Sequence, residues 1–133
     1  MIKLFIGAKG SGKTKTLIEL VNNATAESKG SVVCIEKGDK LRFDITSRAR
    51  LIDTDAYAIT DAVQLYGFVA GILASNSDIT DLFIDSSLKI CRDDVAAFED
   101  FLAKAEKISA DINLVMTASI AVEACPDSIK AYT

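Results

Sequence analysis

The sequence predicts an α/β domain in which a mainly parallel sheet lies between two layers of helices, as in three-layer α/β/α folds. Three observations lead to this prediction. Short apolar runs alternate with longer segments in which apolar residues have helical spacing. Connections between parallel strands are right-handed, so repeated units place helices on both faces of the sheet. No linker, repeat or low-complexity stretch divides residues 1–133, which we therefore expect to form a single domain.

Four apolar runs predict the buried strands. They cover residues 2–6, 31–36, 81–85 and 112–116. Runs that are apolar throughout are typical of parallel strands covered on both faces. Between the second and third runs, a turn at Gly38 precedes two segments, 41–45 and 49–53. We expect these segments to pair as a small β-hairpin around residues 46–48.

Three segments have the apolar spacing of helices, namely residues 13–24, 60–74 and 93–109. Thr60 is the expected N-cap of the second helix. Asp100 and Lys104 are spaced to form an i,i+4 pair on the exposed side of the third. Pro126 is expected to open a short helix near the end of the sequence, because proline suits the first helical turn.

The composition restricts the classes of partner. The formal net charge is −4, and no basic run exceeds Arg48–Ala49–Arg50. A clustered positive face is needed to bind a nucleic acid backbone, so nucleic acid is disfavoured as the main ligand. No apolar run approaches the roughly 20 residues of a membrane span, and the first residues are too short a run for a secretion signal.

The cysteine and histidine contents indicate the compartment and the available chemistry. The three cysteines (Cys34, Cys91 and Cys125) are odd in number and have no C-x-x-C spacing, as expected of reduced thiols in a cytoplasmic protein. Histidine is absent, which removes the commonest general base. Any chemistry must therefore use carboxylates, hydroxyls, lysines and a metal held by oxygen.

The strongest functional pattern follows the first expected strand. Residues 7–14, GAKGSGKT, match G-x-x-x-x-G-K-[ST] in full and lie between a strand and a helix. Glycines allow a tight turn that aims N–H groups at phosphate oxygens, and the helix adds positive partial charge. Lys13 would reach the β- and γ-phosphates, and Thr14 would ligate Mg²⁺. The expected binding residues are Gly7, Ala8, Lys9, Gly10, Ser11, Gly12, Lys13, Thr14 and Lys15.

This loop resembles the Walker A loop of P-loop NTPases. The resemblance implies an aspartate at the end of a buried strand, and Asp85 closes the run LFID. Asp85 would then hold the metal together with Thr14. The N-K-x-D and T-K-x-D motifs with which GTPases read the base are absent, so we expect ATP rather than GTP. Ser86 follows Asp85 where many ATP-hydrolysing P-loop proteins have glutamate, so we expect that hydrolysis would need another base.

Glu36 is the candidate for that base, because RecA-like ATPases resemble this chain in having a glutamate at the end of the strand after the first helix. A solvated glutamate in the following turn is an equal alternative. Thr117 and Ser119, expected just past the fourth strand, are possible γ-phosphate sensors or hydroxyls that cap a turn. The candidate arginine fingers, in cis or from a neighbouring chain, are Arg42, Arg48, Arg50 and Arg92. The simpler expectation is that these arginines are solvated on the surface.

Most of the chain also resembles a group of small bacterial ATP-binding proteins, sometimes labelled twitching-motility-like. The likeness rests on KGSGKTK, FVAGILAS and DLFID. We therefore expect a domain that binds Mg·ATP and acts as a slow or partner-stimulated ATPase, with a protein partner or a second copy of the chain. The alternatives are a regulatory module that binds nucleotide without turnover and a small nucleoside-kinase-like phosphotransferase. The sequence offers the phosphotransferase no arginine-rich lid.

Overall fold

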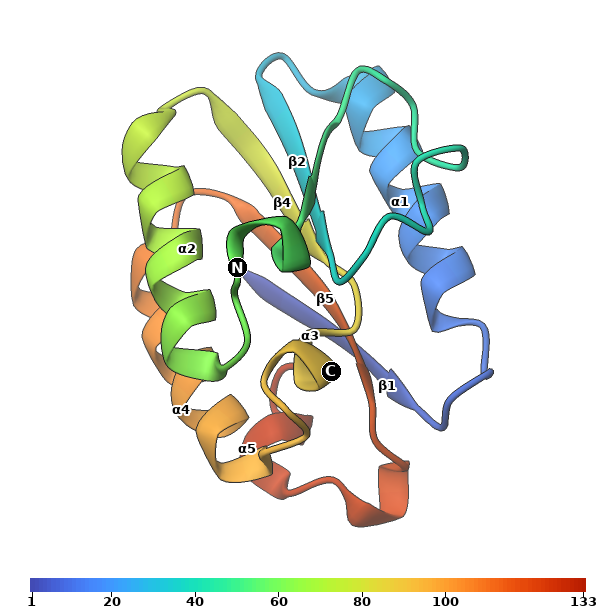
Figure 1. The fold of residues 1–133 in the computed structure, drawn as a ribbon, viewed down its shortest axis with the longest axis vertical. Coiled ribbons are helices and arrows are strands. Elements are labelled where there is room, and N and C mark those ends of the chain that lie inside the picture. The colour runs from blue at the N-terminus through green and yellow to red at the C-terminus, as the bar shows by residue number, and fades with distance from the viewer.

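The computed structural model describes residues 1–133 and contains a five-stranded, wholly parallel sheet (Figure 1). Its strand order is β1-β5-β4-β2-β3. The strands are β1 (Ile2–Gly7), β2 (Ser31–Glu36), β3 (Arg50–Asp53), β4 (Ile79–Ile84) and β5 (Asn113–Ser119). The predicted α/β class and the four predicted strands are therefore confirmed, with shifts of one to three residues at some ends.

Three long helices connect the strands: α1 (Lys13–Glu27), α2 (Ala62–Ser75) and α4 (Val95–Ile108). The short elements are η1 (Thr54–Tyr57), α3 (Ser87–Ile90), η2 (Val122–Ala124) and α5 (Asp127–Lys130). The short helix predicted at Pro126 is α5, in which Pro126 is the N-cap and Asp127 the first helical residue. The Lys104 ammonium lies 3.0 Å from the Asp100 carboxylate on α4, which confirms the predicted pair.

The prediction that Thr60 caps α2 is wrong by one residue. Asp61 is the N-cap, and its carboxylate accepts a 2.8 Å hydrogen bond from the Gln64 N–H. The Thr60 hydroxyl instead donates to the Gln64 side chain. A carboxylate at this position also meets the positive partial charge of the helix start, which favours Asp61 over a neutral hydroxyl.

The two faces of the sheet are covered differently. Helices α2 and α4 pack against one face and against each other, over the larger of two apolar clusters (Figure 1). Helix α1 covers the other face together with the connection formed by residues 37–49, here called loop 37–49. The chain crosses the sheet in one direction from β1 to β2, and in the opposite direction from β3 to β4 and from β4 to β5. Because such crossovers are right-handed, the two directions place the connecting helices on opposite faces.

The prediction of a β-hairpin is wrong, because the irregular loop 37–49 takes its place. Residues 49–53 contribute β3, which pairs parallel to β2 from Val33↔Arg50 to Glu36↔Asp53, and residues 41–45 form turns. The buried residues of this segment are four positions apart: they are Leu41, Ile45 and Ala49, and all three pack against α1. A hairpin arm would need a spacing of two.

Polar contacts hold the middle of loop 37–49 on the side of α1. The Asn22 amide of α1 donates to the Asp44 carbonyl and accepts from the Thr46 N–H, each at 2.9 Å. All three cysteines are buried and unpaired, in agreement with reduced thiols. No helix has the length and apolar character needed to cross a membrane.

Candidate functional site

The topology creates a switch point at the edge of the sheet where the strands end, here called the carboxyl edge. The connection that leaves β1 passes over the α1 face, whereas the connection that leaves β4 passes over the face of α2 and α4. Strand β5 lies between these two strands. Ligands of open α/β sheets bind where neighbouring connections diverge in this way. The glycine-rich loop, residues 7–14, begins at this switch point, directly after β1.

The backbone of the glycine-rich loop has the conformation that its glycines allow. Gly12 has φ of 90° and is the N-cap of α1, with no side chain capping the helix start. A residue with a Cβ is disfavoured at this φ. The first turn of α1 therefore starts at an uncapped glycine, which leaves its N–H groups directed toward the loop. Loop residues Lys9 and Ser11 and the following Lys15 are exposed.

Lys13 folds back across the loop. Its ammonium group donates to the Ala8 carbonyl at 2.8 Å and to the Ser11 hydroxyl at 3.3 Å. Partial burial lowers the pKa of Lys13 from its ordinary value, and the nearby Asp85 carboxylate opposes this shift. A cation that spans the loop and has lost part of its hydration is suited to bind a phosphate anion.

A side-chain hydrogen bond joins the start of α1 to the end of β4. The Thr14 hydroxyl donates to Asp85, with distances of 3.1 Å to Oδ1 and 3.3 Å to Oδ2. Asp85 directly follows β4 and is 8% exposed. The two residues that the sequence proposes as metal ligands are therefore adjacent, although 71 positions separate them.

Thr117 is part of the same network. Its hydroxyl donates to Asp85 Oδ1 at 2.7 Å and accepts from the Ser86 N–H at 2.8 Å. The prediction placed Thr117 just past the strand, but it lies within β5 and is 2% exposed. Both hydrogen-bonding directions of the hydroxyl are used inside the protein. Thr117 thus orients Asp85, a role that its sequence position did not reveal.

The two serines after Asp85 complete the network. Ser86 has φ of 56°, a left-handed conformation that is uncommon for a residue with a side chain. This conformation directs its N–H at Thr117. Ser87 is fully buried, and its hydroxyl donates to the Thr117 carbonyl at 2.8 Å. The segment Asp85–Ser87 is therefore fastened to β5 by side-chain and backbone contacts.

Ser119, the other predicted sensor, occupies a different environment. It is exposed at the end of β5, where the register places it opposite Gly7. Ser119 is therefore beside the start of the glycine-rich loop, and its side chain makes no hydrogen bond to the Asp85 network.

Glu36 is buried at the end of β2, on the α1 face. Its Oε1 accepts from the Lys40 N–H at 3.0 Å and its Oε2 from the Leu41 N–H at 3.1 Å. The side chain is not solvated, since the residue is 2% exposed. Burial raises the pKa of Glu36, the two backbone hydrogen bonds oppose the shift, and Asp85 and Asp53 add to it. Glu36 fastens the start of loop 37–49.

The four arginines do not converge on this site. Arg48 and Arg50 lie near Gly30 and Ser31, toward the edge where the strands begin, here called the amino edge. This placement excludes them as arginine fingers within the same chain. Arg42 pairs with Asp39 at 3.6 Å and covers the exposed Phe43 ring. Arg92 is exposed in the turn after α3.

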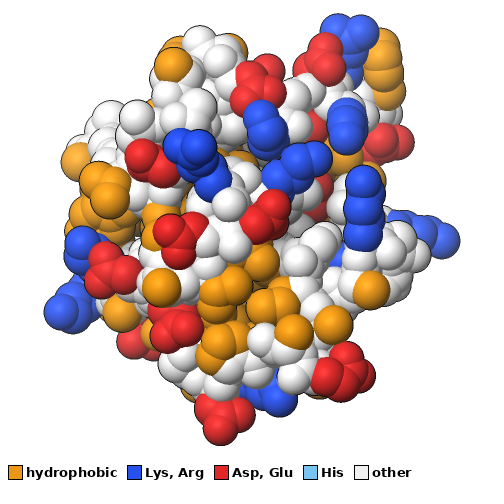
Figure 2. All heavy atoms as spheres, turned by 60° about the horizontal axis from the view of Figure 1, so that its bottom comes forward, with side chains coloured by type: hydrophobic (Ala, Val, Ile, Leu, Met, Phe, Trp, Pro, Cys, Tyr) orange, Lys and Arg blue, Asp and Glu red, His pale blue; other side chains and the backbone are white.

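Figure 2 brings forward the end of the molecule where the glycine-rich loop lies in Figure 1. Lysine and arginine side chains on this face are interspersed with carboxylates and border an apolar area. The face has no continuous positive field.

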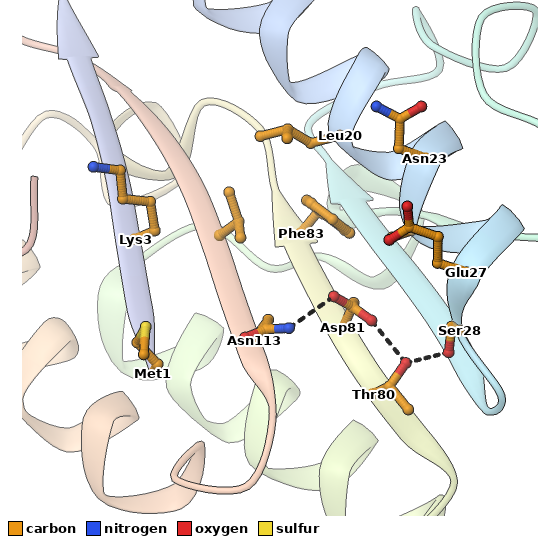
Figure 3. A pocket seen from close by; sticks show the side chains of 12 residues that line it. Met1, Lys3, Leu20, Asn23, Glu27, Ser28, Thr80, Asp81, Phe83 and Asn113 are labelled. Atoms are coloured by element: carbon orange, nitrogen blue, oxygen red, sulfur yellow. Dashed lines mark hydrogen bonds between the residues drawn. The ribbon is translucent and has the colours of Figure 1, made fainter.

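Two hollows lie toward the amino edge, away from the glycine-rich loop. The first, about 410 Å³, is bounded by the last turns of α1 and by β1, β4 and β5 (Figure 3). Asp81 at its side accepts from the Asn113 amide at 3.2 Å and from the Thr80 hydroxyl at 2.7 Å. The second, about 450 Å³, lies between α2 and the starts of β2 and β3.

Comparison with known proteins adds no name to this arrangement. No protein-family model matches the chain, and a search of curated proteins gives no match.

Proposed function

We propose that this chain binds Mg·ATP at residues 7–15, with the nucleotide phosphates over the glycine-rich loop. The observation that carries the proposal is the hydrogen bond between Thr14 and Asp85. A P-loop NTPase requires a hydroxyl at the start of the loop helix and an aspartate at the end of a buried strand to face the same metal.

Lys13 and the loop backbone would bind the phosphates. The Lys13 ammonium now donates to Ala8 and Ser11, and exchanging these acceptors for phosphate oxygens keeps it hydrogen-bonded. The start of α1 contributes N–H groups and positive partial charge to the same place. ATP is preferred to GTP because no motif for reading guanine is present.

Thr14 and Asp85 fit Mg²⁺, which prefers oxygen ligands and is usually bound by one or two protein groups together with substrate phosphates. When bound, the ion neutralises developing charge on the phosphate oxygens. Thr117 keeps the Asp85 carboxylate in a fixed orientation, so that the metal ligand is in place before the nucleotide arrives.

We further propose slow or partner-stimulated hydrolysis. Ser86 follows Asp85 and has no basic group, and both oxygens of the candidate base Glu36 already accept backbone hydrogen bonds. Because Glu36 is only 2% exposed, water must first gain access to its carboxylate before Glu36 can act as a base. The same observation favours the second candidate, a cytoplasmic regulatory module that binds nucleotide without turnover and acts on a protein partner or on a second copy of the chain.

Calorimetric titration with Mg·ATP tests the binding proposal. Lys13→Ala should weaken affinity by at least about tenfold, since hydrogen bonds to charged groups contribute about 1.5–3 kcal/mol. The matched control is Lys29→Ala, which removes an exposed lysine just beyond the other end of α1. Equal affinity of the wild type and Lys13→Ala would show that the loop does not bind the phosphates.

Phosphate release separates the two candidate activities. A slow ATPase that uses Glu36 should lose turnover in Glu36→Gln while retaining Mg·ATP affinity. Turnover that is unchanged in this variant excludes Glu36 as the base. Binding without phosphate release, with or without candidate partner proteins, favours the regulatory module.

A further inference from the structure

The hollow of about 450 Å³ at the amino edge has a composition that differs from the rest of the surface. It lies between the last turn of α2 and the starts of β2 and β3, so it is separate from the glycine-rich loop at the opposite edge. Its floor is formed by apolar side chains, mainly Val33, Ile52, Ile72 and Ile79. A volume of this size falls within the range of small-molecule sites.

Two arginines contribute to the lining of this hollow. Arg48 and Arg50 line it, and neither takes part in any of the three ion pairs of the chain. Neither guanidinium donates a hydrogen bond to a protein acceptor. No carboxylate lines the hollow, although the chain has 19 acidic and 15 basic residues. The hollow is thus a positive region without internal neutralisation in an acidic protein.

The remaining polar groups define where a ligand's charge would lie. Ser75 donates to the Ile72 carbonyl, and Asn76 accepts from the Asp78 N–H, which leaves the Asn76 NH₂ free to donate. The carboxyl end of α2 brings negative partial charge to this wall. An anionic head is therefore favoured at the opposite wall, beside Arg48 and Arg50, while an apolar group covers the floor.

We propose that this hollow binds a small organic anion, in which a carboxylate or phosphate head is joined to an apolar group. The guanidinium fork matches both kinds of head, because it offers parallel N–H donors to two oxygens. The apolar floor can bury the apolar group of such a ligand, whereas a bare inorganic anion has no apolar group to bury. This site does not depend on nucleotide binding at the glycine-rich loop.

NMR titration of the ¹⁵N-labelled chain tests the proposal with four probes: octanoate, octyl phosphate, inorganic phosphate and octylammonium. Octanoate and octyl phosphate carry the two possible head groups on apolar chains of nearly equal length. The probe that binds more tightly shows whether the site prefers a carboxylate or a phosphate head. Amide shifts should centre on Ser31, Arg50 and Ile72–Asn76. Inorganic phosphate should bind at least about tenfold more weakly, and added salt should weaken all anion binding.

The double variant Arg48→Gln/Arg50→Gln should reduce affinity for the better anion by about tenfold or more. The matched control, Arg42→Gln/Arg92→Gln, removes the other two arginines of the sequence and should bind like the wild type. A thermal melt confirms that both variants fold. Equal loss in the two double variants, equal binding of octylammonium, or shifts that map outside the hollow would each overturn the proposal.

Discussion

Replacing Thr117 with valine removes one hydroxyl from the Asp85 network and keeps the shape of the side chain. The substitution deletes the 2.7 Å hydrogen bond to Asp85 Oδ1 and leaves the Ser86 N–H without its acceptor. Because Thr117 is 2% exposed, water cannot easily take the place of the hydroxyl. The change therefore affects both the stability of the fold and the orientation of Asp85.

The size of the effect follows from these two contacts. A hydrogen bond to a charged acceptor contributes about 1.5–3 kcal/mol, and a buried unpaired N–H costs about 1–3 kcal/mol. The losses overlap because they share one oxygen, so we expect Thr117→Val to lower the free energy of unfolding by about 2–4 kcal/mol. Thr117→Ser keeps the oxygen and should cost only about 1 kcal/mol for the lost methyl group.

Two assays separate stability from function. Urea unfolding measures the loss of stability without any reference to nucleotide. Titration with ATP in Mg²⁺ and in EDTA then isolates the metal-dependent part of the affinity. We expect Thr117→Val to reduce the gain in affinity that Mg²⁺ provides by about tenfold, with affinity in EDTA unchanged.

One result would refute the reasoning on Thr117. If Thr117→Val is as stable as Thr117→Ser and retains the full effect of Mg²⁺, the hydroxyl does not orient Asp85. A loss of affinity that is equal with and without Mg²⁺ would instead place Thr117 against the phosphates, as a sensor.

Two further predictions concern Glu36 and Gly12. Burial raises the pKa of Glu36 above its ordinary 4.5, so the folded state binds this proton more tightly than the unfolded state. The stability gained from this proton is fully present below pH 4.5. It is lost as the pH rises through the pKa of the folded state. Urea unfolding between about pH 4 and pH 7 should show this loss in the wild type relative to Glu36→Gln, and a difference that does not vary with pH would contradict it. Gly12→Ala should cost about 1–2 kcal/mol, because φ is 90° although space is open around the position. The control Gly67→Ala, on α2 and equally open, should be neutral or stabilising in the same thermal melt.

Much of the fold was predictable because its signals are local. The apolar runs identified four of the five strands, and the pattern from Gly7 to Thr14 located the loop between β1 and α1. The run LFID also placed Asp85 at the end of a buried strand, and Asp85 directly follows β4. These predictions needed no knowledge of which strands are neighbours.

The predictions that were wrong or missing depend on contacts between distant segments. Thr117 meets Asp85 because β4 and β5 pair in the register Ile84↔Met116, which no local pattern determines. Loop 37–49 was mistaken for a hairpin because alternating residues suggested strands, whereas burial at every fourth residue against α1 decided its structure. The left-handed φ of Ser86 is likewise imposed by its bond to β5 rather than by its residue type.

The pairing of β1 with β5 also has a consequence for how the protein folds. Ile2 is aligned with Leu114, so β1 finds its place in the sheet only after a loop of about 110 residues has closed. Closing such a loop costs about 4 kcal/mol of chain entropy before any contact compensates for it, and pairings of this kind slow folding. The glycine-rich loop lies between β1 and α1, so a nucleotide bound there would stabilise the folded state in which β1 is paired with β5.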